Sequence, residues 1–341
     1  MDVCAEEQKE KLAELTLIFA ANALSVNTRS SYATHVRQYL GFCLTFGHEP
    51  LPATDTVLSQ FFVFQSQTCS PSSLATYTSG IRAFHLENGF SWPHISSRTV
   101  VHRTVQGIKR AFGTPPTPKL AISLEHLMEM RNHLDFEDPN DVMWWAAALV
   151  AFFLSLRKDN VTCEKEGSFN AKSNLCRGDF APQHGWGSIM SGPLWVRLRY
   201  SKTNQNGGRV HTLPLIPNPG SPLCPVTAVA QAFGLDPRCT TGMSAFKVSK
   251  GDEFFPMTHA FFVGRFKSLI RAIGLDPDAY SGHSFRRGAA TLAFTLTDRH
   301  ELIKFLGDWK SDAYLGYNQM SVETKCLLPT LMSLHAARMV A

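Results

Sequence analysis

The chain of 341 residues is 44% hydrophobic and 18% charged, and its formal net charge is +5. This composition is typical of globular proteins and excludes wholesale disorder, and the length leaves room for two domains. The moderate positive charge permits a polyanionic partner without requiring one.

We predict neither a secreted protein nor a membrane protein. The acidic start of the chain lacks the positive region that precedes the apolar part of a secretory signal. The longest apolar run, Met143 to Leu154, is shorter than the roughly 20 residues that span a bilayer. The 8 cysteines form no CxxC pair and have no histidine at zinc-ligand spacing, so neither disulfides nor a zinc module is expected. Reduced thiols fit a nucleus if the source is eukaryotic, and a cytoplasm otherwise.

Two segments near the start have the spacing of amphipathic helices. In residues 28–47 the apolar stripe consists of Tyr32, Val36, Tyr39, Leu40, Cys43 and Phe46. In residues 70–89, Ser70 can cap a helix that has Pro71 at its first position. The stripe of this second helix consists of Leu74, Tyr77, Ile81 and Phe84. Both helices indicate a small helical domain over residues 1–112.

A basic segment that contains prolines separates this domain from the rest of the chain. No acidic residue lies between Glu87 and Glu125. The basic residues in that interval are Arg98, Arg103, Lys109, Arg110 and Lys119. The closely spaced prolines of residues 113–123 favour an extended backbone and exclude a helix. We therefore expect a linker at 113–123 and a second domain over 124–341.

The second domain is predicted to be mostly helical. Helices are expected at 123–134 and 144–156. Alternating apolar residues on both sides of Asn206 and Gly207 predict a β-hairpin, because both turn residues tolerate positive φ. The fold class is therefore mainly α, with one small antiparallel sheet in the second domain.

Two further helices follow the hairpin. The first is expected between a Thr258 cap and Gly274. The second is expected to begin with a capping box from Asp298 to Glu301 and to end at Gly307.

The stretch YSGHSFRRGAAT, residues 280–291, carries His283 and Arg286 at the start of a predicted helix. Side chains three residues apart share a helix face, where a phosphate could meet both of them and backbone N–H groups. A lone HxxR is more often an exposed basic turn. Two other cations change that interpretation, because Arg157 ends the most apolar predicted helix and Lys202 directly precedes the hairpin turn.

The stretch GDWKSDAYLGY, residues 307–317, places Trp309, Tyr314 and Tyr317 after a helix that ends in glycine. Aromatic residues near a C-terminus usually belong to a core or a docking surface. A tyrosine can also act as a nucleophile and form a covalent intermediate.

Arg157, Lys202 in a hairpin, His283 with Arg286, and a late Tyr317 resemble, in this order, the catalytic set of the tyrosine recombinases, also called phage-type integrases. The resemblance covers most of the chain. It implies a SAM-like, DNA-binding core-binding domain over 1–112 and a catalytic domain over 124–341. SGHSFRRGAAT and GDWKSDAYLGY look most like the enzymes of eukaryotic DIRS-type mobile elements.

The resemblance also implies roles for these residues. Arg157 and Arg286 would clamp the non-bridging oxygens of the scissile phosphate, and His283 would accept or orient a proton. Lys202 would be the general acid toward the departing 5′-oxygen. Tyr317 would attack phosphorus and leave a 3′-phosphotyrosine.

The chain departs from the family's pattern at Asn160, where the family often has Glu, and at Asp308, where it usually has His or Trp. Because a phosphate repels a carboxylate, we expect Trp309 to enter the site and Asp308 to point away. Tyr314 lies three residues before Tyr317 and is the alternative nucleophile.

The chemistry accounts for these residue types. Phosphoryl transfer from DNA needs charge stabilisation, in-line positioning and a proton donor, which two guanidinium groups and a lysine supply. The covalent intermediate conserves bond energy for rejoining, so no cofactor is expected. The sequence has neither an acidic metal cluster near these motifs nor a P-loop.

The expected partner is double-stranded DNA. The basic residues that we predict to contact it are Arg29, Arg37, Arg82, Arg98, Arg103, Lys109 and Arg110. The family implies a homo-tetramer on two DNA sites, and the apolar tail 321–341 is expected to dock on a neighbouring subunit or to cover its own core.

We therefore predict a site-specific recombinase that integrates or excises mobile DNA. One alternative is a sequence-specific DNA-binding protein, derived from a mobile element, that does not transfer strands. A type IB topoisomerase would share the chemistry but would relax DNA without sequence choice.

Overall fold

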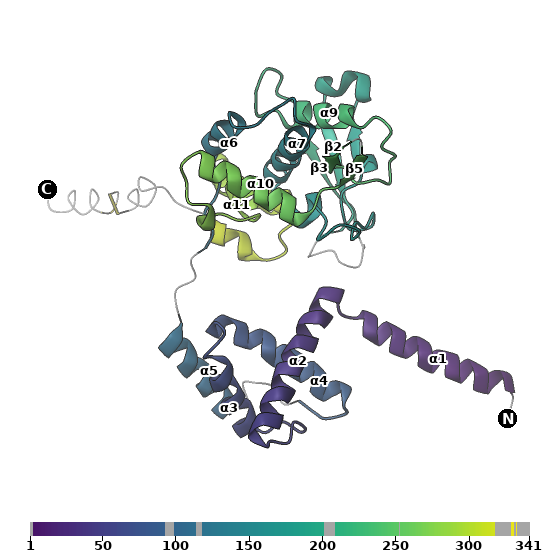
Figure 1. Ribbon diagram of the computed structural model, residues 1–341, viewed down its shortest axis with the longest axis vertical. Coiled ribbons are helices and arrows are strands. Elements are labelled where there is room, and N and C mark those ends of the chain that lie inside the picture. The colour runs from purple at the N-terminus through teal and green to yellow at the C-terminus, as the bar shows by residue number, and fades with distance from the viewer. Residues whose placement is uncertain are drawn as a thin grey trace. The chain divides into compact units, whose positions relative to one another are not determined.

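The computed structural model describes residues 3–92, 99–113, 118–200, 209–251, 253–317, 329, 330 and 332. The chain divides into two compact units, Met1–Thr117 and Pro118–Ala341 (Figure 1). Each unit has a hydrophobic core of its own. The described residues are mainly helical with small antiparallel sheets, which confirms the predicted fold class.

The described part of the first unit consists of helices. They are α1 (Val3–Asn22), α2 (Val26–Phe46), α3 (Asp55–Gln65), the 3-10 helix η1 (Pro71–Ser73), α4 (Leu74–Glu87) and α5 (Thr99–Phe112). Ser25 starts α2 by accepting a hydrogen bond from the Thr28 N–H, and Gly47 ends it with a φ of 67°. The core lies between α2, α3, α4 and α5.

The buried face of α2 differs in part from the predicted stripe. Tyr39 and Cys43 are buried as expected, but Leu40 and Phe46 are exposed. Phe42 takes their place in the core, where its ring centroid lies 5.5 Å from that of Phe61. Residues 39, 42 and 43 share one helix face, whereas position 40 is turned away from it.

Residues 99–112, which the sequence marked only as basic, form α5. Val101 and Ile108 are buried, and α5 packs against α3. The amphipathic pattern of this helix was missed because its apolar positions are separated by several basic and polar residues. The opposite face of α5 therefore presents its basic side chains to solvent.

The second unit is organised around α7 (Pro139–Phe153), whose residues from Val142 to Phe152 are all buried. Against it pack α9 (Pro225–Leu235), α11 (Ser284–Leu296) and strand β4 (Lys247–Lys250). The other helices are α6 (Leu124–Arg131), α8 (Lys158–Val161), α10 (His259–Ala272), α12 (His300–Gly307), η2 (Arg177–Asp179), η3 (Trp186–Ser191), η4 (Pro277–Ala279) and η5 (Asp312–Tyr317).

The described residues of the second unit form two small antiparallel sheets where we predicted one. β1 (Phe180–Pro182), β2 (Leu194–Leu198) and β3 (His211–Leu215) form the first sheet, and β4 pairs with β5 (Glu253–Pro256) in the second. β2 and β3 are the predicted hairpin strands.

β2 and β3 pair in antiparallel register. Leu198 pairs with His211, and Leu194 pairs with Leu215. A two-residue turn at Asn206 and Gly207 in continuous register would instead pair Leu198 with Leu215. The described pairing ends at Leu198 and His211, and the predicted turn at Asn206 and Gly207 lies outside the described residues.

Part of the expected linker at 113–123 belongs to the second unit. The Leu120 N–H donates to the Ala279 carbonyl at 2.8 Å, and the Ile122 N–H donates to the Ser284 carbonyl at 3.2 Å. Ile122 is buried. The division between the two units falls between Thr117 and Pro118.

The predicted capping box of α12 is not formed. The helix begins at His300 with Arg299 as its N-cap, and no side chain caps it. Its end at Gly307 is as predicted, but the residue that takes the left-handed conformation is Asp308, with a φ of 52°. Glycine at 307 leaves room for the Trp309 ring.

Candidate functional site

Arg286 is a buried arginine of the second unit whose guanidinium group has several partners. It lies in the first turn of α11, and only 2% of its surface is exposed. Its Nη1 donates to the Ser155 carbonyl at 2.5 Å, and its Nη2 donates to the Gly307 carbonyl at 2.7 Å. Its Cζ lies 4.0 Å from the centroid of the Trp309 ring. These contacts fix the plane of the guanidinium group between two carbonyls and an indole.

Ser155 lies in the turn between α7 and Arg157, and it is hydrogen-bonded to Arg286 of α11. α7 ends at Phe153, and Ser155 has a φ of 50°, a left-handed conformation. Its hydroxyl also donates to the Arg286 carbonyl at 3.4 Å. The expectation that Arg157 ends the apolar helix is therefore wrong. Arg157 is the N-cap of α8, because the chain leaves α7 through this turn.

Arg157 is held at its backbone by Asn160. Its N–H donates to the Asn160 Oδ1 at 3.2 Å, and the Asn160 Nδ2 donates to the Tyr200 carbonyl at 3.4 Å. The amide thus joins the start of α8 to the chain just after β2. A carboxylate at position 160 could accept the first bond but could not donate the second.

His283 is the N-cap of α11, and its side chain reaches solvent. Removal of water by neighbouring groups lowers the pKa of His283 below its ordinary value. The charges of Arg157, Lys158 and Arg286 lower this pKa further, whereas Asp159 opposes them. The cations that act on His283 come from α8 and α11, so the predicted residues Arg157, His283 and Arg286 gather in one region.

Lys158, Asp159 and His259 form a polar cluster next to this region, which the sequence did not reveal. The Lys158 Nζ lies 2.5 Å from the Asp159 Oδ1 and 3.0 Å from the His259 Nδ1. A Cβ at Gly282 would come within 2.8 Å of the Lys158 side chain, so this glycine lets the lysine stem lie against the residue before His283. No sequence motif marks these three side chains, since α8 and α10 are brought together only by the fold.

The small residues of α11 serve packing in the core. A Cβ at Gly288 would lie 2.1 Å from the Ile122 carbonyl oxygen and 2.8 Å from the Phe152 ring. The close approach of Gly288 is to the extended segment at Ile122 and to α7.

Trp309 and Asp308 diverge after α12. Trp309 is 9% exposed and lies beneath Arg286, whereas the Asp308 carboxylate pairs with Arg209. A Cβ at Gly307 would lie 1.8 Å from the Trp309 ring. Glycine at 307 is therefore required so that the indole can fold back over the end of the helix.

Tyr314 is buried, and both its hydroxyl and its ring contact other side chains. Its hydroxyl lies 2.7 Å from the His300 Nδ1, and its ring stacks on Phe294 with the centroids 5.8 Å apart. Only 3% of its surface is exposed. Tyr317 is the last residue of η5, and its side chain lies outside the described part of the structure, as does Lys202.

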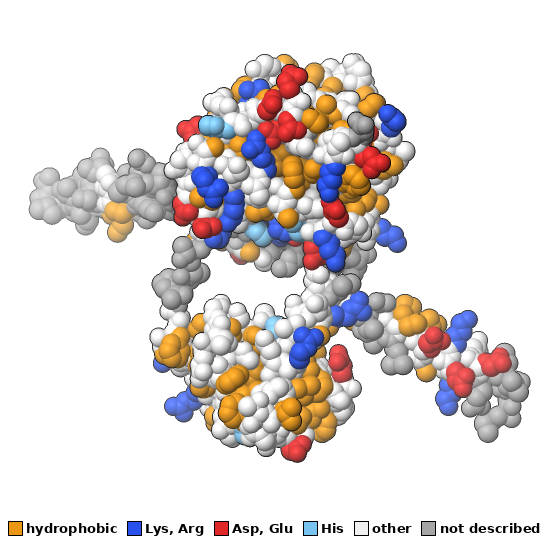
Figure 2. Space-filling model, viewed as in Figure 1, with side chains coloured by type: hydrophobic (Ala, Val, Ile, Leu, Met, Phe, Trp, Pro, Cys, Tyr) orange, Lys and Arg blue, Asp and Glu red, His pale blue; other side chains and the backbone are white. Residues whose placement is uncertain are grey.

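The basic residues predicted to contact DNA lie on the surface of the first unit. Those that are described and exposed are Arg29 and Arg37 on α2, Arg82 on α4, and Arg103, Lys109 and Arg110 on α5. Arg98 lies outside the described residues. On the face of the second unit in Figure 2, lysine and arginine side chains are spread among acidic and apolar ones.

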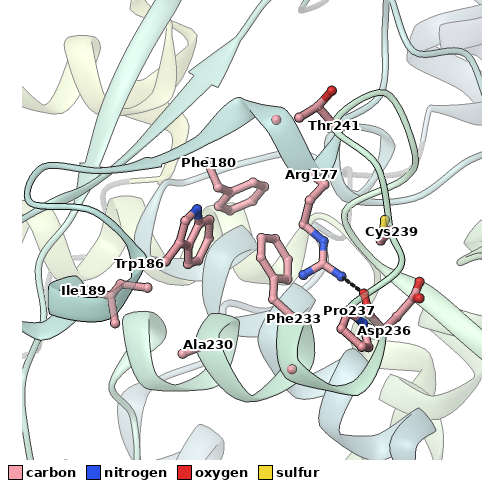
Figure 3. Close-up of a pocket in the computed structure, with 12 residues that line it drawn as sticks. Arg177, Phe180, Trp186, Ile189, Ala230, Phe233, Asp236, Pro237, Cys239 and Thr241 are labelled. Carbon is pink, nitrogen blue, oxygen red and sulfur yellow. Dashed lines mark hydrogen bonds between the residues drawn. The ribbon is translucent and has the colours of Figure 1, made fainter.

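A cleft of about 530 Å³ lies between η2, β1, η3 and the end of α9 (Figure 3). Its aromatic residues are Phe180, Trp186 and Phe233, and the Arg177 Cζ lies 3.7 Å from the centroid of the Phe233 ring. Arg177 also donates to the Asp236 carbonyl at 2.9 Å. Of the predicted catalytic residues whose side chains are described, Arg157, His283, Arg286 and Trp309 all lie outside its lining.

Two features are absent from the described residues. In that part of the chain, no helix is long and apolar enough to cross a membrane. The same residues contain no group of three or more His, Cys, Asp or Glu side chains that could hold a metal ion.

No family model and no curated protein matches this chain. Solved structures do match its fold. The XerH site-specific recombinase bound to a palindromic difH substrate has a TM-score of 0.58 at 12% identity, and the match covers 90% of this chain and 78% of that one. A lambda integrase dimer bound to a core site has a TM-score of 0.57 at 13% identity, with 91% and 98% covered.

The integrase of the Tn1549 transposon, in complex with transposon right end DNA, has a TM-score of 0.58 at 11% identity. That match covers 96% of this chain and 98% of the integrase chain. At such low identity the likeness is one of fold. The chain therefore has the fold found in site-specific recombinases and integrases.

Proposed function

We propose that this protein is a site-specific DNA recombinase that cuts and rejoins DNA through a 3′-phosphotyrosine intermediate. The observation that carries the proposal is the environment of Arg286. Its guanidinium group is buried, fixed by the Ser155 and Gly307 carbonyls and stacked on Trp309. A buried and immobilised arginine beside a surface histidine and a second arginine is suited to bind a phosphodiester.

In the proposed reaction, Arg157 and Arg286 bind the non-bridging oxygens of the scissile phosphate. The Tyr317 oxygen attacks phosphorus, and the bond from phosphorus to the 5′-oxygen breaks. Lys202 donates a proton to that leaving oxygen. Trp309 fixes Arg286 and offers its indole N–H toward the phosphate. Attack by a 5′-hydroxyl on the phosphotyrosine reverses these steps and rejoins the DNA.

His283 is suited to take the proton of the attacking tyrosine. Its lowered pKa keeps the imidazole neutral near pH 7, which is the form that can accept a proton. The positive charges around it also favour the anionic transition state of phosphoryl transfer.

Tyr317 is the proposed nucleophile in preference to Tyr314. The Tyr314 hydroxyl is engaged by His300, and its ring is enclosed between Phe294 and Trp309. An attack from Tyr314 would require those contacts to break.

We further propose that the first unit is a DNA-binding core-binding domain and that a homo-tetramer assembles on two DNA sites. The fold likeness to recombinases and integrases that were solved with DNA supports a DNA partner. Integration or excision of a DIRS-type mobile element, in the nucleus of a eukaryotic host, is the biological role that we propose.

A covalent-trapping assay tests the function. The protein is incubated with a library of randomised duplexes that carry a nick near the cleavage position, and adducts are separated on a denaturing gel. We expect the wild-type chain to form an adduct and Tyr317→Phe to form none. Binding of duplexes without any adduct would favour the alternative, a DNA-binding protein without strand transfer.

A further inference from the structure

The C-terminal end of α12 is a junction of several elements. Carbonyls at the end of a helix have no partner within the helix and carry partial negative charge, so donors and cations bind there. The His211 Nε2, from the start of β3, lies 2.8 Å from the Phe305 carbonyl. Arg286, from α11, occupies the Gly307 carbonyl. The same short segment thus contacts both β3 and the proposed phosphate-binding arginine.

Asp308 adds an ion pair to this junction. It takes the left-handed conformation after α12, which aspartate tolerates better than most residues other than glycine. Its side chain is only 8% exposed, and a buried carboxylate needs a partner to offset the loss of water. Arg209, with 47% of its side chain exposed, pairs with it.

Arg209 also has a particular place in the chain. It is the first described residue after residues 201–208, and Tyr200 is the last one before them. The Tyr200 carbonyl is bound by Asn160, which also holds the backbone of Arg157. Before residues 201–208, Tyr200 is therefore linked by hydrogen bonds to the Arg157 segment. After them, Arg209 is linked by an ion pair to the end of α12.

We propose that Asp308 is a positioning residue, which through Arg209 fixes the chain before β3 on the same turn that holds Arg286 and Trp309. This inference rests on the proposed function. The carboxylate that stands next to Trp309 then serves as an anchor within the protein, and its charge is neutralised by Arg209 before any phosphate binds.

Four single variants, and the double variant of Asp308→Asn with Arg209→Gln, test the role of the ion pair in the trapping assay. Asp308→Asn and Arg209→Gln each remove it, Arg209→Lys keeps the positive charge, and Glu301→Gln is the matched control. Glu301 pairs with Arg299 at the opposite end of the same helix and is exposed. The readouts are the rate of adduct formation at saturating nicked duplex and the duplex concentration that gives half of that rate.

We expect Asp308→Asn and Arg209→Gln each to lower the saturating rate about tenfold, since small misplacements of catalytic groups slow chemistry. The half-saturating concentration should stay unchanged. The double variant should be no slower than either single one, because both lose the same interaction. Arg209→Lys should recover most of the rate, and Glu301→Gln should match the wild type. Additive losses, or an equal loss in Glu301→Gln, would overturn the proposal.

A measurement without DNA separates this inference from the proposed function. The Arg286 Nε–H resonance, assigned with Arg286→Lys, reports the position of the guanidinium group over the Trp309 ring. It should shift in Asp308→Asn and in Arg209→Gln and stay in place in Glu301→Gln. An unshifted resonance in both pair variants would overturn the positioning role even if the wild type forms adducts. If the wild type forms no adduct, the proposed function is contradicted. The Arg286 resonance then still decides whether Asp308 and Arg209 position the guanidinium group.

Discussion

Arg286 and Trp309 form a cation–aromatic contact at the candidate site, with the Arg286 Cζ 4.0 Å from the centroid of the Trp309 ring. Arg286 lies in α11, whereas Trp309 follows the end of α12, and Arg286 also donates to the Gly307 carbonyl. Each arginine fork presented to a phosphate must be held against thermal motion, and this packing supplies that restraint.

The first prediction concerns the ring beneath Arg286. Trp309→Phe keeps an aromatic face but loses the indole N–H, so we expect the rate of adduct formation to fall about tenfold. Trp309→Ala removes the support altogether and should reduce the rate about a hundredfold or more. Single-turnover trapping with a nicked duplex measures both. Equal rates for the two variants would show that the ring does not position Arg286.

The second prediction concerns Gly307. A methyl group at this position would overlap the Trp309 ring, so Gly307→Ala should displace the indole and lower the free energy of unfolding by about 1–3 kcal/mol. Adduct formation should fall with it. Gly264→Ala is the matched control, because a Cβ at Gly264 in α10 meets nothing within 4 Å. That control should raise the free energy of unfolding by about 0.5–1 kcal/mol in urea denaturation.

The third prediction concerns the pH dependence of His283. Partial loss of water and the neighbouring cations lower the pKa of His283, so the imidazole should stay neutral as the pH falls through the ordinary value of about 6.5. Adduct formation should therefore be constant through that range and decline only at lower pH, where His283 gains its proton.

The same prediction has a direct spectroscopic check. Asp159 raises the pKa of His283, so Asp159→Asn should lower it further in an NMR titration. Asp312→Asn, which removes a carboxylate that pairs with Lys304, should leave it unchanged. A His283 pKa at or above its ordinary value in the wild type would contradict the charge arrangement.

The fourth prediction separates the two tyrosines. Tyr314→Phe removes the hydrogen bond to His300 but keeps the ring packed on Phe294, so the adduct should form at no less than about a tenth of the wild-type rate. Loss of the adduct in Tyr314→Phe together with its retention in Tyr317→Phe would reverse the assignment of the nucleophile.

The fifth prediction concerns the exposed face of α5. If Arg103, Lys109 and Arg110 contact DNA phosphates, each change to Gln should weaken binding uniformly across sequences. Each should also reduce the slope of log K against log salt by about one. Fluorescence anisotropy at several salt concentrations measures this slope. Lys250→Gln, which removes an exposed lysine that pairs with Glu166, should leave the slope unchanged.

The sequence alone was sufficient for the fold class and for the identity of several candidate residues. Periodic apolar residues marked α2 and α4, because a half-buried helix requires that pattern. A continuous apolar run marked α7, and the residues at the two ends of α10 marked that helix. Arg286 was found from the spacing of its motif. Its surroundings could not be predicted, because Ser155 and Gly307 lie far from it in the chain and meet it only through tertiary packing.

Local features misled the sequence analysis where tertiary contacts decide. Gly307 was read as a helix stop, but the left-handed residue is Asp308 and the glycine makes room for Trp309. Asp308 was expected to avoid a phosphate, and no pattern in the sequence indicated that Arg209 binds it. The register of β2 and β3 depends on side-chain burial along both strands, which a turn motif does not determine.

The most direct test of the central claim is the chemical identity of the covalent link. The adduct from a nicked duplex is digested with protease and nuclease, and the modified peptide is sequenced by mass spectrometry. The account predicts one modified residue, Tyr317, joined to the 3′-phosphate of the cleaved strand. A nucleotide on Tyr314, or a tyrosine joined to a 5′-phosphate, would contradict it.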